Sequence, residues 1–523
     1  MTATMFTQIG SVLIMETIGR FRRPSTVILF LILCGTAFLM MPDGTGGVMF
    51  LIGSRRVFLN SAATSLTSAL MGGLILSLLG FYLISNSVAR DSRTGVGRLI
   101  AATPLSSARY LAGKLAGNIV YMTALVFVFM IACMGMHILR GEAALEPMVY
   151  IRTFGIMFLP MIPTVAAIAL MFECVPVLSG RGGDMLYFFI WVASLGFTVA
   201  IVHGSNSHPW ILTVDITGLG FFIEEIRSVM NTSGFSIGYA PFDASLPPAF
   251  FGGLQWLPEY VVPRLASTLV LLPVFLIALI SFRRFDPARK SRGKMIGNGR
   301  LSRLSRTLAS VGRRIAVPRG GWMTGHPSFV KNVFLDVRLT ASLNPFFMLL
   351  TAFACFFSLI VPLEAVRSAI LPVIFFILIP SIAPISTRDR IGNVTRLLFS
   401  APRIRKHFVS FKLFSAFLSA FFLCIVPVVR LCLSDPFGAF ALFNGLFFIA
   451  ASATALGFLT RTPKTFVSLF LLFLYAALGA KGAPGFDFAG FQGIVTFPVI
   501  LAYTATGCIL LVVAWGVERY RNA

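Results

Sequence analysis

The sequence predicts an all-α polytopic membrane protein with twelve transmembrane helices, arranged as two pseudo-symmetric six-helix halves. Composition is the first reason, because the 523 residues are 57% hydrophobic and only 12% charged, which lies outside the range of soluble domains. The second reason is that apolar residues gather into runs of roughly 20, the length that crosses the hydrocarbon of a bilayer. The third is a charged segment that occurs twice in the chain.

The apolar runs fall into two groups of six. The first group lies at about 25–42, 61–88, 113–138, 150–175, 185–204 and 261–282. The second group lies at about 344–362, 367–387, 411–433, 436–459, 464–480 and 493–516. Six spans in each half return the chain to the same side of the membrane, so the two halves are expected to share one orientation.

The basic residues predict how the chain is oriented. The formal net charge is +24, and in a membrane protein such an excess marks cytoplasmic loops and does not indicate a nucleic-acid partner. A cytoplasmic N-terminus places most lysines and arginines inside, so both termini are predicted to be cytoplasmic, in a bacterial inner membrane. The basic segment 283–327 is interpreted as a cytoplasmic linker that lies on anionic membrane lipid.

A charged insert follows the second span of each group. It reads RDSRTGVGRLIAATPLSSARYLAGK at 90–114 and RDRIGNVTRLLFSAPRIRKHFVSFK at 388–412. A shift of 298 positions superposes Arg90 on Arg388, Asp91 on Asp389, Arg98 on Arg396, Leu99 on Leu397, Pro104 on Pro402 and Lys114 on Lys412. Each insert is predicted to hold a short helix that its proline ends.

The repeat sets the expected domains. The first transmembrane half covers 1–282, with an interfacial helix at about 6–23, a coupling segment at 90–112 and an outer re-entrant segment at about 205–260. The second half covers 328–523, with an interfacial helix at about 328–341 and a coupling segment at 388–410. Its outer segment is only 481–493, so the outer gate is expected to be asymmetric.

The inserts allow a simple interpretation, in which basic loops do no more than fix topology. The recurrence of six residues in register favours a shared task instead. We expect the short helices to carry exposed side chains that present cations and one acid to a partner outside the membrane.

These residues resemble a known family. An Arg-acid pair, a Gly-containing turn, a Leu-rich step, a Thr-Pro pair and a Lys at the third span resemble the cytoplasmic loop of ABC-2 type ABC transporter permeases. The matching residues are Arg90, Asp91, Gly95, Thr103, Pro104 and Lys114, and in the second half Arg388, Asp389, Pro402 and Lys412. The chain departs from the family at Arg98 and Arg396, where a Glu is common, and has Asn393 in place of Gly95.

The resemblance implies that each insert is a coupling helix seated in a separate ATPase. The chain has no G-x-x-x-x-G-K-[ST] loop, so it is not expected to be an enzyme by itself. The resemblance implies two copies of a soluble ABC ATPase, with ATP and Mg on that partner, and export of an amphipathic or lipid-like substrate by alternating access. The expected ATPase-coupling residues are Arg90, Asp91, Arg98, Thr103, Pro104, Lys114, Arg388, Asp389, Arg396, Pro402 and Lys412. No catalytic residue, cofactor or metal site is expected in the chain, and the substrate-binding residues are unknown.

The alternative is a proton-coupled secondary transporter of the major facilitator type. That family has a D-R-x-G-R type motif after its second span, and Asp389, Arg390 and Gly392 resemble part of it. Such a transporter needs ionisable groups within the membrane. Glu173 is the best candidate for one, but a hydrogen-bonded structural role is favoured because it lies near the end of its span. A membrane enzyme has little support, since the five histidines lack metal-binding spacing.

Overall fold

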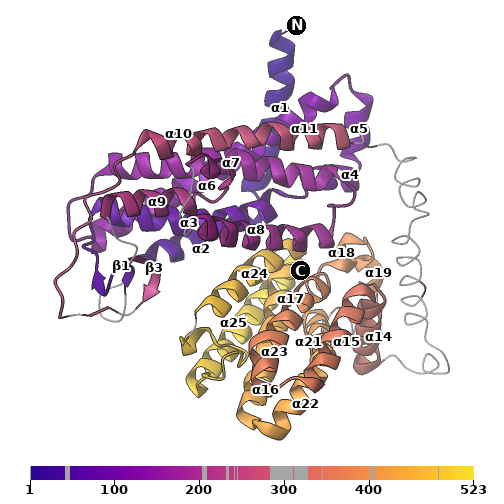
Figure 1. The fold of residues 1–523 in the computed structure, drawn as a ribbon. Coiled ribbons are helices and arrows are strands. Elements are labelled where there is room, and N and C mark those ends of the chain that lie inside the picture. The colour runs from indigo at the N-terminus through magenta and orange to yellow at the C-terminus, as the bar shows by residue number, and fades with distance from the viewer. Residues whose placement is uncertain are drawn as a thin grey trace. The chain divides into compact units, whose positions relative to one another are not determined.

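The computed structural model describes residues 2–41, 48–202, 209–230, 235–240, 242–243, 245–282, 285, 310, 328–343, 345–400, 405, 407–480 and 482–522. The chain divides into two compact units, Met1–Pro287 and Ala288–Ala523, called unit 1 and unit 2. Figure 1 colours unit 1 from indigo to pink and unit 2 from orange to yellow. Most of the predicted linker, 283–327, lies outside the described residues.

Unit 1 is a helical bundle with a small sheet at one end. Its helices are α1 (Thr2–Phe21), α2 (Pro24–Leu39), α3 (Ser61–Ile84), α4 (Ser87–Thr94), α5 (Val96–Ala102), α6 (Ser107–Arg140), α7 (Pro147–Cys174), α8 (Arg181–Val202), η1 (Pro209–Val214), α9 (Leu219–Met230), α10 (Pro258–Ala266), η2 (Ser267–Val270) and α11 (Leu271–Ser281). Helix α3 is the most buried of the long helices and packs against α7 and α6. Its first turn is capped by the side chain of Asn60, which accepts a hydrogen bond from the backbone N–H of Ala63.

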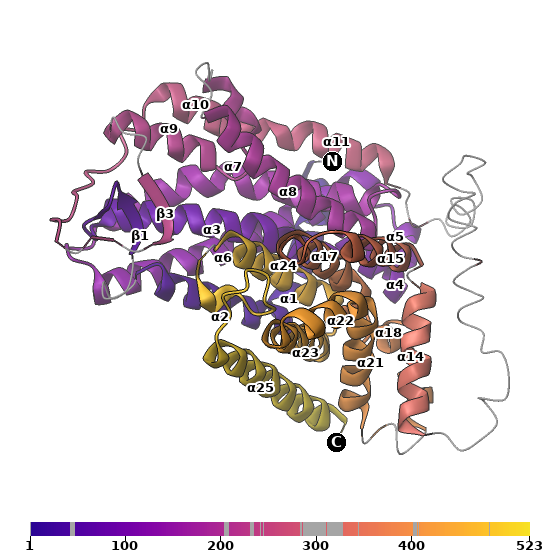
Figure 2. The same ribbon diagram turned by 60° about the horizontal axis from the view of Figure 1, so that its bottom comes forward.

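The small sheet was not predicted from the sequence. Strand β1 (Val48–Ile52) pairs antiparallel with β2 (Arg55–Arg56) and with β3 (Phe235–Ala240), in the order β2-β1-β3. A two-residue turn with Gly53 at φ 61° joins β1 to β2, because a tight hairpin needs a left-handed residue there. Figures 1 and 2 show β1 and β3 at one end of unit 1 and α4 and α5 at the other.

Unit 2 is a second helical bundle. Its elements are α14 (Phe329–Leu343), α15 (Pro345–Ile360), α16 (Leu363–Ala365), η4 (Val366–Ile370), α17 (Leu371–Ile382), α18 (Arg388–Ile391), α19 (Thr395–Phe399), α21 (Phe408–Leu423), α22 (Ile425–Ser434), α23 (Pro436–Thr460), α24 (Pro463–Gly479), η5 (Pro484–Phe486) and α25 (Phe497–Asn522). Helix α23 is apolar on every side and lies in the centre, in contact with α21, α22, α24 and α25. Figure 1 shows α18 and α19 at one end of this unit and α16 and α22 at the other.

The chain is a multi-pass membrane protein. Among the described residues, seven helices are long and apolar enough to cross a membrane, and nine if each of two bent pairs is one span. The bent pairs are α1 with α2, at 68°, and α21 with α22, at 69°. A helix lies over each of the twelve predicted ranges, but some are short, such as α15 with 16 residues and α24 with 17. The structure therefore supports seven to nine of the twelve predicted spans.

Candidate functional site

Each insert folds into two short helices separated by a residue with left-handed backbone. In the first insert, Gly95 has φ 82° between α4 and α5. In the second, Asn393 has φ 57° between α18 and α19. Glycine and asparagine are the residues that adopt this conformation most readily. Asn393 therefore keeps the turn that Gly95 makes.

Glu173 holds the start of the first insert. Its carboxylate accepts hydrogen bonds from the backbone N–H groups of Ser87, at 2.9 Å, and Val88, at 2.6 Å. These two N–H groups begin α4 and have no partner within the helix. The hydrogen-bonded structural role predicted for Glu173 is therefore confirmed.

Four charged residues join the first insert to its neighbours, and we call Glu16, Arg90, Asp91 and Lys114 the first junction. The Lys114 Nζ lies 2.5 Å from Glu16 Oε2 and 2.7 Å from Asp91 Oδ2. The Arg90 Nη2 lies 2.7 Å from the same oxygen of Glu16. All but Arg90 are buried. The first junction thus ties the insert to both α1 and α6.

Polar neighbours complete the first junction. The Tyr110 hydroxyl donates a hydrogen bond of 2.8 Å to Asp91 Oδ2, and the Lys114 Nζ lies 5.5 Å from the centre of the Tyr110 ring. Arg20 forms an ion pair of 2.9 Å with Glu16. It also donates to the carbonyl oxygens of Leu83, at 3.0 Å, and Ile84, at 2.8 Å, at the end of α3. These partners offset the cost of burying charge.

Two glycines let α1 approach α6 closely enough for these ion pairs. A Cβ atom on Gly113 would lie 2.7 Å from Val12 Cβ, and one on Gly117 would lie 3.0 Å from Glu16 Cβ. Both distances are too short for unstrained packing. The glycines on either side of Lys114 therefore place Glu16 within its reach.

The second insert carries the same arrangement, and we call Asp336, Arg388, Asp389 and Lys412 the second junction. The Lys412 Nζ lies 2.5 Å from Asp389 Oδ2 and 3.2 Å from Asp336 Oδ1. Arg388 forms an ion pair with Asp336. The Lys412 Nζ lies 5.6 Å from the ring centre of Phe408, which is 298 positions after Tyr110. In both inserts the arginine and the lysine pair with an acid from the helix that precedes the first span of that half, and the lysine also pairs with the aspartate of the insert.

Those two acids were missed by the sequence analysis. Glu16 lies 74 positions before Arg90, whereas Asp336 lies 52 positions before Arg388, so a single shift of the sequence does not superpose them. A signal was nevertheless present, because each is the only acid in its predicted interfacial helix.

The burial of the junctions corrects one expectation. The inserts were expected to present one acid to an outside partner, but Asp91 and Asp389 are buried, as are Lys114 and Lys412. Carboxylates and ammonium groups that leave water need each other as partners. The acids of the inserts therefore hold the insert in place and face no partner.

Both inserts also expose apolar side chains. Val96 and Leu99 in the first insert are 43% and 70% exposed, and Val394 and Leu397 in the second are 42% and 75% exposed. We call residues 96–99 and 394–397 the two insert tips. Their matching positions, 298 apart, carry matching exposure.

The remaining predicted residues of the inserts divide into two groups. Arg98, Thr103 and Pro104 are exposed on or beside α5 and take no part in the first junction. The side chain of Arg396 and all of Pro402 lie outside what the structure describes.

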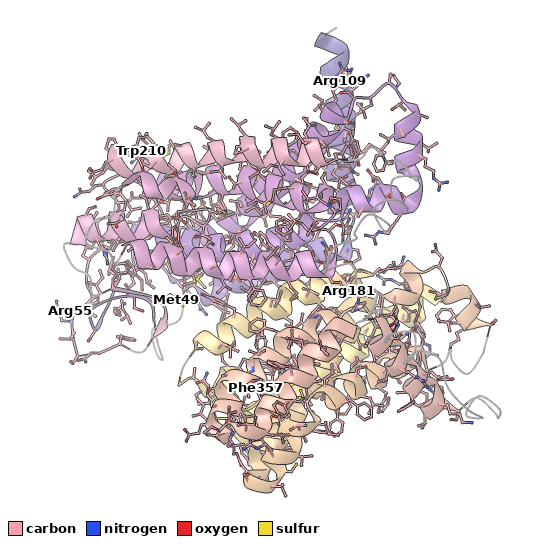
Figure 3. All side chains as sticks on the ribbon, turned by 45° about the vertical axis from the view of Figure 1, so that its right-hand side comes forward. Met49, Arg55, Arg109, Arg181, Trp210 and Phe357 are labelled. Carbon is pink, nitrogen blue, oxygen red and sulfur yellow. The ribbon has the colours of Figure 1, made fainter. Side chains whose placement is uncertain are left out.

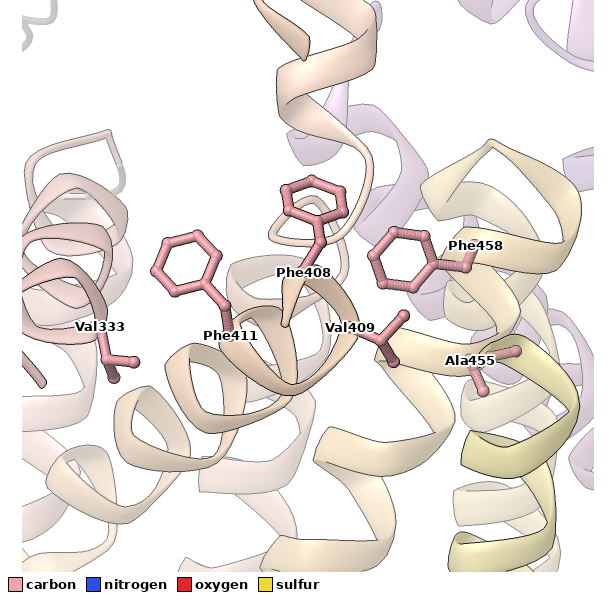
Figure 4. Packing of buried hydrophobic residues seen from close by; sticks show 7 residues of the cluster. Val333, Phe408, Val409, Phe411, Ala455 and Phe458 are labelled. Carbon is pink, nitrogen blue, oxygen red and sulfur yellow. The ribbon is translucent and has the colours of Figure 1, made fainter. Parts of the chain in front are cut away.

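Each tip has an apolar inner face that anchors it. Behind the first tip, Gly97 is buried against the Phe285 ring, which meets Tyr110 edge-on at 5.6 Å. Behind the second, Phe399 meets Phe408 edge-on at 5.1 Å. Figure 4 shows Phe408 beside Phe458 in the buried cluster of unit 2. The tips are therefore held from within by packing as well as by the junctions.

No protein-family model, curated protein or solved structure matches this chain. Within the described part of the chain, no group of three or more His, Cys, Asp or Glu side chains could hold a metal ion. Any functional conclusion therefore rests on the ion pairs of the junctions and on the exposed apolar side chains of the tips.

Proposed function

We propose that this chain is the transmembrane permease subunit of an ATP-driven ABC exporter, and that its insert tips dock on two copies of a soluble ATPase. The observation that carries this proposal is the matched exposure of Val96 and Leu99 with that of Val394 and Leu397. Exposed apolar area on a polar loop costs about 25 cal/mol per Å² unless something covers it. Its recurrence in both inserts favours a partner with two equivalent sites.

The junctions give the tips a mechanical connection to the bundle. Motion of the first tip would pass through Asp91 to Lys114 on α6 and to Glu16 on α1. The second tip would act through Asp389 on α21 and α14 in the same way. The junction residues are therefore positioning residues, and the contacts with the ATPase fall to the tips and to Arg98.

The rest of the proposal follows from the sequence. Without a phosphate-binding loop in the chain, ATP and Mg belong to the partner. The positive-inside rule places the tips and both termini in the bacterial cytoplasm. Twelve spans in two pseudo-symmetric halves would alternate between inward-facing and outward-facing states around an amphipathic or lipid-like substrate.

A proton-coupled transporter of the major facilitator type is the second candidate. The buried carboxylates of the junctions favour it, because proton-coupled transporters use such groups. In this chain, however, Glu16 lies beside three cations, Arg20, Arg90 and Lys114. Those cations stabilise the charged form of the carboxylate and disfavour proton uptake.

Photo-crosslinking tests the proposed docking. A p-benzoylphenylalanine would replace Leu99 or Leu397 in the full chain, expressed in its native cells, and captured proteins would be identified by mass spectrometry. Leu139 is the matched control, because it is an exposed leucine at the far end of α6. We expect both tips, and not position 139, to capture one protein with a G-x-x-x-x-G-K-[ST] loop. Capture at neither tip, or equally at position 139, would overturn the proposal.

ATP hydrolysis separates the two candidate functions. The captured ATPase would be assayed with and without the full chain in lipid nanodiscs. The proposal predicts that the chain changes the rate of ATP hydrolysis and that Leu99→Ser with Leu397→Ser abolishes the change. A facilitator would leave the rate unaltered.

A further inference from the structure

A cavity lies in unit 1 at the end opposite the first insert. It has a volume of about 290 Å³ and opens where α3 and α7 begin. Helix α3 has 24 residues, so roughly 36 Å separates its two ends. Figure 3 shows Arg55 and Met49 at the sheet end of unit 1 and Arg109 at the insert end. The cavity is therefore a second site, separate from the first junction.

The cavity holds one cation and one anion that do not neutralise each other. The Arg152 guanidinium lies 5.7 Å from the centre of the Trp256 ring, and it has no hydrogen bond or ion pair with any described residue. The Glu146 carboxylate likewise has none within the described part of the chain, although its backbone N–H donates to Ser61 Oγ at 2.9 Å. Both side chains are exposed at the cavity. A ligand with both signs of charge would satisfy them together.

The aromatic wall of the cavity is held in a strained conformation. Trp256 has φ 58°, which is unfavourable for a residue with a large side chain. The next N–H, of Leu257, donates to Glu225 Oε1 at 2.9 Å, and Glu225 is fully buried. The Trp256 ring also stacks on Phe221, with 6.5 Å between ring centres. Glu225 and Phe221 thus fix the ring on which Arg152 rests.

The rim of the cavity is apolar. Phe250 and Met148 both line it and are both largely exposed. In a membrane protein such side chains are suited to contact with acyl chains. The cavity itself lies at the small end of the range for ligand pockets, which suits a headgroup and excludes the chains.

We propose that this cavity binds the headgroup of a zwitterionic phospholipid. The phosphate would accept hydrogen bonds from the Arg152 guanidinium, whose planar fork suits such an anion. The ammonium would lie against the Glu146 carboxylate. The acyl chains would leave over Phe250 and Met148 into the bilayer.

Calorimetry on the full chain in a neutral maltoside detergent tests this proposal. Dihexanoylphosphatidylcholine is titrated below its micelle concentration, and saturable binding at one site is expected. Arg152→Gln should weaken the affinity by about tenfold or more. Arg55→Gln is the matched control, since Arg55 is an exposed arginine on β2 that does not line the cavity. Equal loss of affinity in the two variants, or none in either, would overturn the proposal.

Two further ligands test the charge pattern and the lipid origin of the headgroup. Dihexanoylphosphatidylglycerol lacks the cation, so it should bind more weakly than phosphatidylcholine and gain affinity in Glu146→Gln. Glycerophosphocholine lacks the chains and should bind much more weakly. Equal binding of glycerophosphocholine would show a site for a soluble ligand and contradict the lipid assignment. No ATPase is present in these titrations, so their failure would leave the proposed docking of the tips unaffected.

Discussion

The two junctions share their ion pairs and differ in what surrounds them. In the first, Asp91 accepts a hydrogen bond from Tyr110, whereas the second has Phe408 at that position and no hydroxyl to donate. In the second, Arg388 instead donates to Thr340 Oγ1, at 2.8 Å. The difference shows which parts are interchangeable. The lysine bridge between two acids occurs in both junctions, while the accessory hydrogen bonds vary.

The largest expected effect is the loss of the bridging lysine. Removing one partner of a buried ion pair typically costs about 3 to 5 kcal/mol. Lys412→Met should destabilise the protein by roughly this amount, because Lys412 is the ion-pair partner that the structure gives Asp389. Lys114→Met should cost less, because Asp91 keeps Tyr110 and Arg90.

Thermal unfolding of the full chain in detergent measures both lysine variants. Arg55→Met is the control, because it removes an exposed cation outside both junctions. If all three variants unfold at the same temperature, the junctions contribute no stability of their own.

An exchange of the aromatic residues tests whether the hydroxyl matters. Tyr110→Phe removes a hydrogen bond to a charged, buried carboxylate and should cost about 1.5 to 3 kcal/mol. Phe408→Tyr should be neutral or stabilising, because the new hydroxyl would lie where Tyr110 lies in the first junction. The same unfolding assay applies, and destabilisation by both changes would contradict the equivalence of the two positions.

The residue at the break of each insert offers a smaller test. A Cβ on Gly95 would meet no atom within 4 Å, so any effect comes from the backbone alone. Gly95→Ala should cost about 1 to 2 kcal/mol, because alanine resists the left-handed conformation. Gly95→Asn should cost clearly less, as Asn393 already occupies the equivalent turn. Equal stability of the two variants would mean that the turn is not fixed.

The smallest effect on stability is expected at the tips. Leu99→Ser and Leu397→Ser replace exposed side chains and should change the free energy of unfolding by no more than about 0.5 kcal/mol. Their effect should fall on ATPase binding instead. Marked destabilisation by either change would indicate that the tips pack within the chain.

The sequence predicted the inserts and the helices over the apolar ranges, because both depend on residue type and local spacing. It did not predict that Asp91 and Asp389 are buried. The acids Glu16 and Asp336, which share the bridging lysines with them, come from distant helices at different offsets, and only the fold brings them together.

The bends within the two helix pairs were not predicted from the sequence. Hydropathy alone does not show where a helix bends. Pro24 begins α2 after the break from α1, and Pro427 lies in the first turn of α22 after the break from α21. Proline is tolerated in a first turn and not in a helix interior, so these two residues mark the bends. The hairpin of β1 and β2 was not predicted, because β2 has only two residues and the five residues of β1 are all apolar, so neither strand shows an alternation of apolar and polar residues.

Native mass spectrometry of the complex tests the central claim most directly. The complex of the full chain with the ATPase identified by crosslinking should contain two ATPase copies, one for each insert tip. Leu99→Ser combined with Arg98→Ser should leave one copy bound, and the further change Leu397→Ser should leave none. Two copies retained in all variants, or none bound to the unmodified chain, would contradict the proposal that the matched tips are the docking sites.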